Sequence, residues 1–278
     1  MRIPAPVVAR VLGALVRPVL GPRVPVSVQR GLQDVFTRAN RLPSEVTSTQ
    51  VVLGGRPALR FDPPTPLPDR AVLWLHGGAF ITGSMVTHRA FAAGLALASD
   101  VPVYLLDYRL APEHRHPAAV DDAVAALDLV PQGRVVLGGD SAGGCLALLA
   151  ALRQSRALVG LALVSPVVDA TRRTAAAYTG TDVLITTAWL EQGSRAMFGE
   201  DAPDLLQEDL SALPPTVLHV SQHERLRREG ELLAQRLLTC ELVVLPGLWH
   251  DAHLQTGLVR EADDAVARLG ASITRLLT

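Results

Sequence analysis

The 278-residue chain is 49% hydrophobic and 19% charged, which is typical of a globular protein that buries a large core without disulfides. Its net charge of −1 argues against a nucleic-acid partner, and the complete absence of lysine excludes Schiff-base, pyridoxal-phosphate and P-loop lysine chemistry. Cys145 and Cys240 fit no metal or redox spacing, so we expect free thiols in a reducing compartment and no bound metal.

Residues 7–17 form an apolar stretch interrupted by Arg10 and Arg17, which lie seven positions apart and share one face of a helix. The stretch lacks the unbroken apolar core and cleavage site of a signal peptide, and no apolar run is long enough to span a bilayer. We interpret it as an amphipathic helix on the protein's own surface, with a peripheral membrane helix as the alternative. We therefore predict a cytoplasmic protein and expect no membrane contact.

After this segment, strand patterns alternate with helix patterns. Residues 46–53 and 56–61 flank Gly54-Gly55 and predict a hairpin. Apolar runs that predict strands buried on both faces lie at 71–75, 101–106, 134–137, 159–164, 215–220 and 242–245. Helix patterns lie at 91–98, 117–129, 143–153, 229–238 and 260–277. The alternation indicates an α/β fold with a mostly parallel sheet, and residues 171–209 interrupt it as an irregular or helical insertion.

The strongest chemical signal is the pentapeptide Gly139-Asp140-Ser141-Ala142-Gly143, which lies between a predicted strand and a predicted helix. In this context a G-x-S-x-G sequence forms a nucleophile elbow, where a sharp turn projects the serine oxygen and the glycines avoid clashes. We predict Ser141 as the nucleophile. A glycine-rich turn with an ordinary serine cap is the alternative.

The sequence His76-Gly77-Gly78-Ala79-Phe80 directly follows the predicted strand 71–75. Acyl transfer requires N–H donors aimed at the developing oxyanion, and glycines let the backbone approach the substrate closely. We predict the oxyanion hole from the N–H groups of Gly77, Gly78 and Ala142. A tight strand-to-helix turn is the alternative.

A general base and a triad acid are expected after the nucleophile, in the chain order serine, acid, histidine. His250 follows the last predicted strand, and His253 is its nearest competitor. Glu224 is the only carboxylate in the loop directly after the strand 215–220. We predict His250 as the base and Glu224 as the residue that orients it, with a solvated glutamate at a helix start as the alternative.

Three motifs together resemble the bacterial hormone-sensitive-lipase family of esterases. They are the two loops above and the stretch Tyr108-Arg109-Leu110-Ala111-Pro112-Glu113-His114, which Pro117-Ala118-Ala119 and Asp121-Asp122 follow. The resemblance covers residues 71–250 and implies an eight-stranded α/β-hydrolase core at 46–278 with a small helical cap made of residues 1–45 and the insertion at 171–209. It also implies no cofactor and the hydrolysis of short- to medium-chain acyl esters.

The chain departs from this family's pattern at three places. Ala79 replaces the third glycine of the oxyanion run, Glu224 replaces the usual aspartate, and Asp251-Ala252 follows the histidine in place of the common Gly-Phe. Because glutamate is one methylene longer, its loop is expected to lie slightly further from the histidine.

The substrate is expected to be a small ester. Phe80, Trp249, Met197 and Phe198 are predicted to line the acyl pocket, although each could equally belong to the core. A lactonase or amidase with the same triad, and a non-catalytic ligand-binding protein of the same fold, are the alternative functions. The sequence leaves open whether the chain forms a homodimer.

Overall fold

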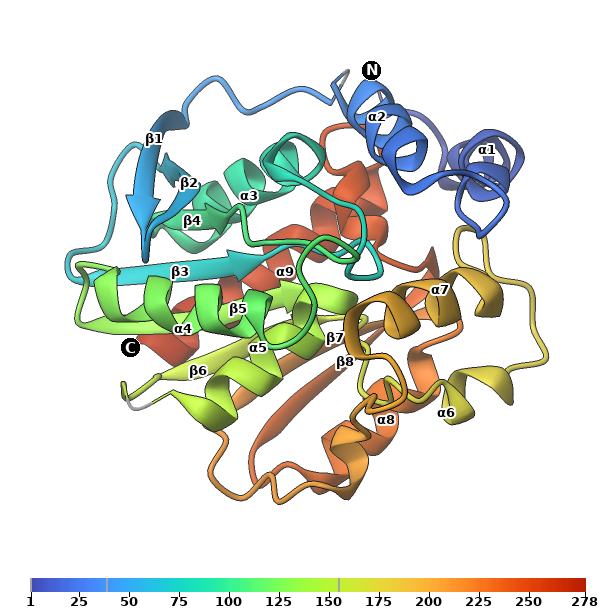
Figure 1. Cartoon of the computed structure of the whole chain (residues 1–278). Helices are drawn as coiled ribbons and strands as arrows, with labels where there is room; N and C mark the ends of the chain where they lie inside the picture. Colours follow the sequence, from blue (N-terminus) through green and yellow to red (C-terminus); the bar gives the residue numbers. More distant parts are fainter. Residues whose placement is uncertain (1, 39, 155) are drawn as a thin grey trace.

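A computed structural model describes residues 2–38, 40–154 and 156–278. Eight strands form one sheet in the order β1-β2-β4-β3-β5-β6-β7-β8 (Figure 1). The strands are β1 (Thr47–Leu53), β2 (Arg56–Asp62), β3 (Arg70–Leu75), β4 (Val103–Leu106), β5 (Arg134–Asp140), β6 (Gly160–Val164), β7 (Thr216–His223) and β8 (Cys240–Trp249). β2 pairs antiparallel with β1 and β4, and the remaining pairs are parallel.

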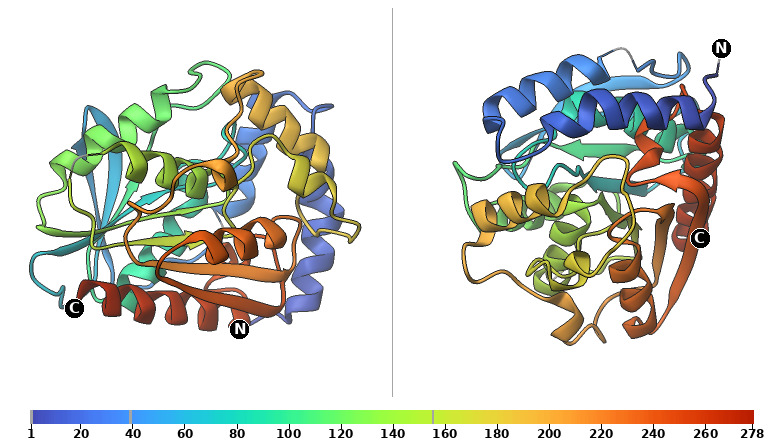
Figure 2. Two further views of the ribbon diagram at one scale, coloured as in Figure 1. Left: turned by 90° about the horizontal axis from the view of Figure 1, so that it is seen from below. Right: turned by 90° about the vertical axis from the view of Figure 1, so that its right-hand side faces the viewer.

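Helices cover both faces of this sheet, as Figure 2 shows. The long helices are α3 (Met85–Ser99), α4 (Ala118–Leu129), α5 (Ala142–Arg153), α8 (Arg227–Arg236) and α9 (Arg260–Leu277). Alternate residues of β3 enter two separate cores, with Leu73 facing the side of α4, α5 and α8, and Val72 facing α3 and α9. Burial on both faces explains the continuous apolar runs of the central strands. The predicted α/β-hydrolase architecture is confirmed.

Two elements extend beyond their sequence patterns. α3 begins six residues before the predicted start because Ser84 Oγ accepts hydrogen bonds from the N–H groups of Val86 and Thr87, while Thr87 Oγ1 accepts from the Ser84 N–H. β8 continues to Trp249 because it is an edge strand paired with β7, which holds it extended past Pro246. The first extension brings His88 to the site, and the second brings His250 there.

The N-terminal helices and those between β6 and β7 lie on the right-hand side of the molecule in Figure 1. The N-terminal ones are α1 (Ala5–Val11), η1 (Leu12–Val16), η2 (Arg17–Val19) and α2 (Val26–Thr37). Those between β6 and β7 are α6 (Arg173–Ala176), α7 (Thr187–Phe198) and η3 (Leu205–Gln207), and η4 (Ala252–Gln255) follows β8. Trp189 Nε1 donates to Gln29 Oε1 at 2.8 Å and joins α7 to α2. None of the described helices is both long and apolar enough to cross a membrane.

Candidate active site

Ser141 occupies the sharp turn between β5 and α5. Its φ of 50° and ψ of −117° lie outside the favoured regions for a residue with a side chain. A Cβ at Gly143 would overlap the carbonyl oxygen of Leu75, so only glycine allows the start of α5 to lie this close to β3. The glycine at position 143 is therefore required for this sharp turn. The turn holds the Ser141 oxygen at the carboxyl end of the sheet.

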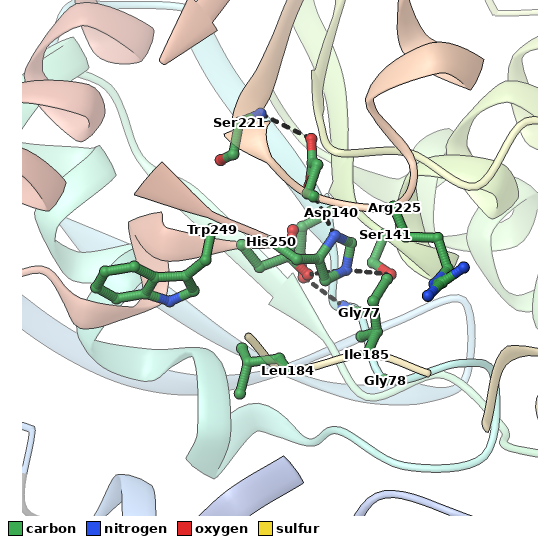
Figure 3. A network of polar contacts seen from close by, with 12 residues as sticks. Gly77, Gly78, Asp140, Ser141, Leu184, Ile185, Ser221, Arg225, Trp249 and His250 are labelled. Carbon is green, nitrogen blue, oxygen red and sulfur yellow. Dashed lines mark hydrogen bonds and ion pairs between the residues drawn. The ribbon is translucent and has the colours of Figure 1, made fainter. Parts of the chain in front are cut away.

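The structure brings Ser141, His250 and Glu224 into one relay. Figure 3 shows the contact between Ser141 and His250. His250 Nε2 lies 3.0 Å from Ser141 Oγ, and His250 Nδ1 lies 2.8 Å from Glu224 Oε2. The second Glu224 oxygen accepts the Ser221 N–H at 2.7 Å, which fixes the carboxylate against β7. All three side chains are buried, and Glu224 is completely inaccessible.

A second carboxylate reaches the same imidazole from its other side. Asp251 Oδ2 lies 3.0 Å from His250 Nε2, at the same distance as Ser141 Oγ. Asp251 is itself buried, and its backbone is left-handed with a φ of 52°, a conformation that aspartate tolerates better than most residues. Sequence reasoning noted Asp251 only as a departure from the family pattern and missed its contact with the base.

The two carboxylates control the charge of the histidine. Burial disfavours the charged ring, but the negative charges of Asp251 and Glu224 outweigh burial and raise the pKa of His250 well above its ordinary value. Burial also raises the pKa of Asp251 to about 7, against the opposing effect of His250. We therefore expect His250 and Asp251 to titrate as a coupled pair.

Asp140 anchors the loop that was predicted to hold the oxyanion. Its Oδ1 accepts Trp74 Nε1–H at 2.7 Å, and its Oδ2 accepts the Gly77 N–H at 2.8 Å and lies 2.9 Å from His88 Nε2. Burial opposes ionisation of Asp140, but His88 lowers its pKa, and Asp140 in turn raises the pKa of the buried His88. Asp140, Trp74, Gly77 and His88 thus form a buried polar bracket between β3, β5 and α3.

This bracket changes the assignment of the oxyanion donors. Because the Gly77 N–H donates to Asp140, it is not free to meet an oxyanion. Among the described residues, no protein acceptor receives the N–H groups of Gly78, Ala79 or Ala142. Gly78 and Ala79 have φ values of 122° and 50°, which turn the chain sharply after the Gly77 peptide. The available donors thus lie one residue further along the loop than predicted.

An apolar cavity of about 340 Å³ lies above Ser141 and His250. Its walls come mostly from α1, η1, α2 and the segment before α7, including Val8, Leu12, Leu20, Leu184, Ile185 and Trp189. The predicted lining requires correction, because Phe80, Met197, Phe198 and Trp249 do not line this cavity and are buried in the cores. Phe80 packs against Phe198 with ring centroids 5.2 Å apart, and Trp249 Nε1 donates to Gln255.

The competing histidine lies away from the nucleophile. His253 Nε2 is 3.0 Å from His219 Nδ1, in a buried pair that joins η4 to β7. His76 stacks on Tyr108, whose hydroxyl donates to the His76 carbonyl at 2.6 Å, so this histidine supports the loop from below. Sequence reasoning missed His88 altogether, although the Ser84-to-Thr87 capping pattern marks the helix that carries it.

Comparisons with known proteins agree with this geometry. Residues 72–254 match a model of the alpha/beta hydrolase fold family. The chain is 35% identical to an acetyl-hydrolase of Streptomyces hygroscopicus (73% of this chain, 74% of the relative) and 33% identical to an ethyl acetate hydrolase of Pseudomonas putida (72% and 71%).

Solved structures show the same likeness over the whole chain. A hormone-sensitive lipase from a metagenome library superposes with a TM-score of 0.92 at 27% identity over 100% of both chains. An esterase of the bacterial hormone-sensitive lipase family does so with a TM-score of 0.86 at 27% identity, over 97% of this chain and 98% of that one. With its three motifs and its fold, the chain belongs to the bacterial hormone-sensitive-lipase family of α/β-hydrolases.

Proposed function

We propose that this carboxylic-ester hydrolase is a serine esterase that cleaves short- to medium-chain acyl esters, with Ser141 as nucleophile, His250 as general base and Glu224 as triad acid. One observation carries the proposal: the contacts run without a break from Glu224 Oε2 through both ring nitrogens of His250 to Ser141 Oγ, below an apolar cavity. Nucleophilic catalysis by serine requires this arrangement of nucleophile, base and orienting acid.

The reaction proceeds in two acyl transfers. His250 Nε2 takes the proton of Ser141 Oγ as the oxygen bonds to the ester carbonyl carbon, and Glu224 stabilises the imidazolium. The carbon–oxygen bond to the alcohol then breaks, and the leaving oxygen takes the proton from Nε2. Water next loses a proton to Nε2 and attacks the acyl-enzyme, and Ser141 leaves with that proton as the acid is released.

For the oxyanion we propose the N–H groups of Gly78, Ala79 and Ala142 in place of the set that includes Gly77. The support is that these three donors have no acceptor in the described protein, whereas the Gly77 N–H serves Asp140. Ala142 also begins α5, so the partial positive charge of a helix N-terminus adds to its donor. In this proposal the hydrogen bond from the Gly77 N–H to Asp140 holds the loop in place, so that the following N–H groups of Gly78 and Ala79 can face the oxyanion.

The acyl group would occupy the apolar cavity. Its volume of about 340 Å³ is near the lower end of ligand pockets, and its apolar wall offers no partner for a charged acyl chain. Most of this wall belongs to residues 1–45 and 171–209, and treating these segments as a cap over the core at 46–278 is part of the proposal. The ethyl acetate hydrolase relative supports a small ester as the substrate.

The test is hydrolysis of p-nitrophenyl esters from acetate to decanoate by the wild type and by Ser141→Ala. We expect activity to peak at short to medium chains and the variant to lose at least about 10³-fold in kcat. Equal activity in the variant would refute the nucleophile, and faster hydrolysis of decanoate than of butyrate would refute the chain length. Parallel lactone and amide substrates separate an esterase from a lactonase or amidase, and inactivity on all of them would indicate a ligand-binding protein.

A further inference from the structure

The N-terminal helices expose an unusual amount of apolar surface. Of the twelve large apolar side chains exposed in the described chain, six lie within the first 36 residues, between 43% and 61% accessible. They are Val7, Val11, Leu15, Val28, Val35 and Phe36, and we call the surface that carries them the cap face. α1 and α2 lie side by side in both views that show them clearly (Figures 1 and 2), and both contribute to the wall of one cavity.

α1 carries apolar residues on two sides, and only one of these sides packs against the hydrophobic core. Ala5 and Val8 are buried in the core formed with β8 and η4. Val7, Val11 and Leu15 repeat every four residues on another side and are 46–56% exposed. A helix that only covers a core carries polar residues outside. The outer apolar row therefore needs an explanation beyond packing.

The charge around the cap face is strongly positive. Residues 2–45 contain seven arginines and two carboxylates. Arg2 and Arg30 pair with Asp263 and Glu113 outside this segment, which leaves a net charge of +3 in a chain whose total is −1. Arg10, Arg23, Arg38 and Arg41 are exposed and form no ion pair within the described residues. An apolar row flanked by unpaired arginines is the pattern of a helix that lies in the interface of an anionic membrane.

The cavity opens on the same face. Val7, Val11, Leu15 and Phe36 line the cavity and are also 43–56% exposed, so they form its mouth. Ser141 and His250 lie at the other end of this cavity. A surface applied to the cap face would thus cover the entrance to the nucleophile.

We propose that the cap face docks on an anionic lipid bilayer, with α1 and α2 in the plane of the interface and the cavity mouth toward the acyl chains. A second copy of the chain fits this surface less well, because a symmetric dimer would set two positively charged patches against each other. Docking on the bilayer does not depend on whether the protein hydrolyses esters. The consequence that the enzyme draws its ester from the bilayer rests on the proposed function.

The test is co-sedimentation of the whole protein with vesicles of phosphatidylcholine, with and without one quarter phosphatidylglycerol. We expect binding to the anionic vesicles at low salt, and binding about tenfold weaker to neutral vesicles or in molar salt. No binding, or equal binding to both vesicles at both salt concentrations, would overturn the proposal.

Matched variants locate the surface. Val28→Ser with Val35→Ser changes two exposed residues of α2 that do not line the cavity, so binding should fall about tenfold while soluble-ester hydrolysis stays within about twofold. The control variant is Leu129→Ser with Leu238→Ser. It changes two exposed residues in the segments that precede β5 and β8, and it should bind vesicles like the wild type. Equal loss in both pairs would overturn the location. The location would also be overturned if the wild type formed a dimer that dissociates only in the Val28→Ser, Val35→Ser variant.

Ser141→Ala separates the two proposals, because it should bind vesicles like the wild type. If it binds and the wild type hydrolyses no ester, docking stands and the proposed function fails. If neither protein binds while the wild type hydrolyses soluble esters, only docking fails.

Discussion

The framework around Ser141 and the proposed cap over it are held by different kinds of contact. In the framework, buried polar atoms are bonded to one another, as in the three contacts that Asp140 makes with Trp74, Gly77 and His88. The cap presents apolar side chains to the cavity, and several of them remain half exposed. Trp189 to Gln29 is one of its few buried side-chain hydrogen bonds.

This difference follows from what each region has to do. Acyl transfer requires the nucleophile, base and oxyanion donors within a fraction of an ångström of their working positions, which a bonded polar network supplies. An acyl chain needs only apolar surface of roughly the right shape. Changes in the framework should therefore alter rate or stability, and changes in the cap should alter substrate preference.

The largest effect is expected from Glu224→Gln. The amide cannot stabilise the imidazolium, so kcat should fall by about 10³–10⁴-fold in ester hydrolysis, with an unchanged circular dichroism spectrum. Glu208→Gln changes an exposed glutamate and is the control, which should keep full activity. Near wild-type activity in Glu224→Gln would refute Glu224 as the triad acid.

Asp140→Ala tests whether the bracket stabilises the fold. Removal of the carboxylate leaves the buried His88 ring and the N–H groups of Trp74 and Gly77 without their Asp140 partner, so the free energy of unfolding should fall by about 3–5 kcal/mol in urea titration. The exposed Asp201→Ala should change it little. A loss below about 1 kcal/mol in Asp140→Ala would show that the bracket positions the loop at Gly77 but does not stabilise the folded protein.

Asp251→Asn tests the electrostatics of the base. Asp251 raises the pKa of His250, and only the neutral imidazole can take the serine proton, so activity appears as pH rises through that pKa. Without this negative charge the pKa of His250 falls, and the acid limb of kcat/KM should move about one unit to lower pH. Asp264→Asn, at an exposed site, should leave the limb in place. An unmoved limb in Asp251→Asn would exclude this role.

Ile185→Ala tests the cap, with the smallest effect. Ile185 is buried in the cavity wall, so the shorter side chain should shift kcat/KM toward longer acyl chains by about tenfold in the ratio of octanoate to butyrate. Ile273→Ala removes the same atoms from the core beneath α9 and should lower stability without changing that ratio. The same shift in both variants would mean that loosening of the fold, rather than cavity shape, sets the preference.

Much of the fold was predictable because its signals are local. Central strands buried on both faces must be continuous apolar runs, and the runs at 71–75 and 159–164 match β3 and β6 closely. The element boundaries that differed depend on more distant information. α3 starts at a capping pattern that the helix periodicity does not contain, and β8 is prolonged by its pairing with β7.

The candidate site divides in the same way. Ser141, His250 and Glu224 could be proposed because each follows a recognisable strand in a fixed chain order, and the structure brings them within hydrogen-bond distance. The glycine pattern alone does not favour the donor set that we propose for the oxyanion, because that proposal depends on which N–H the Asp140 carboxylate accepts. That contact joins residues 63 positions apart.

The sequence by itself indicated a mostly parallel α/β fold and an elbow at Ser141, because steric rules for turns and burial rules for strands act over a few residues. The hydrolase family was indicated by the resemblance of its three motifs. Only the tertiary structure decided that Asp251 contacts His250 Nε2 and that α1, α2 and Ile185 form the cavity wall instead of Phe80, Met197, Phe198 and Trp249. Those features depend on how segments far apart in the chain approach one another, and a single sequence does not carry that distance information.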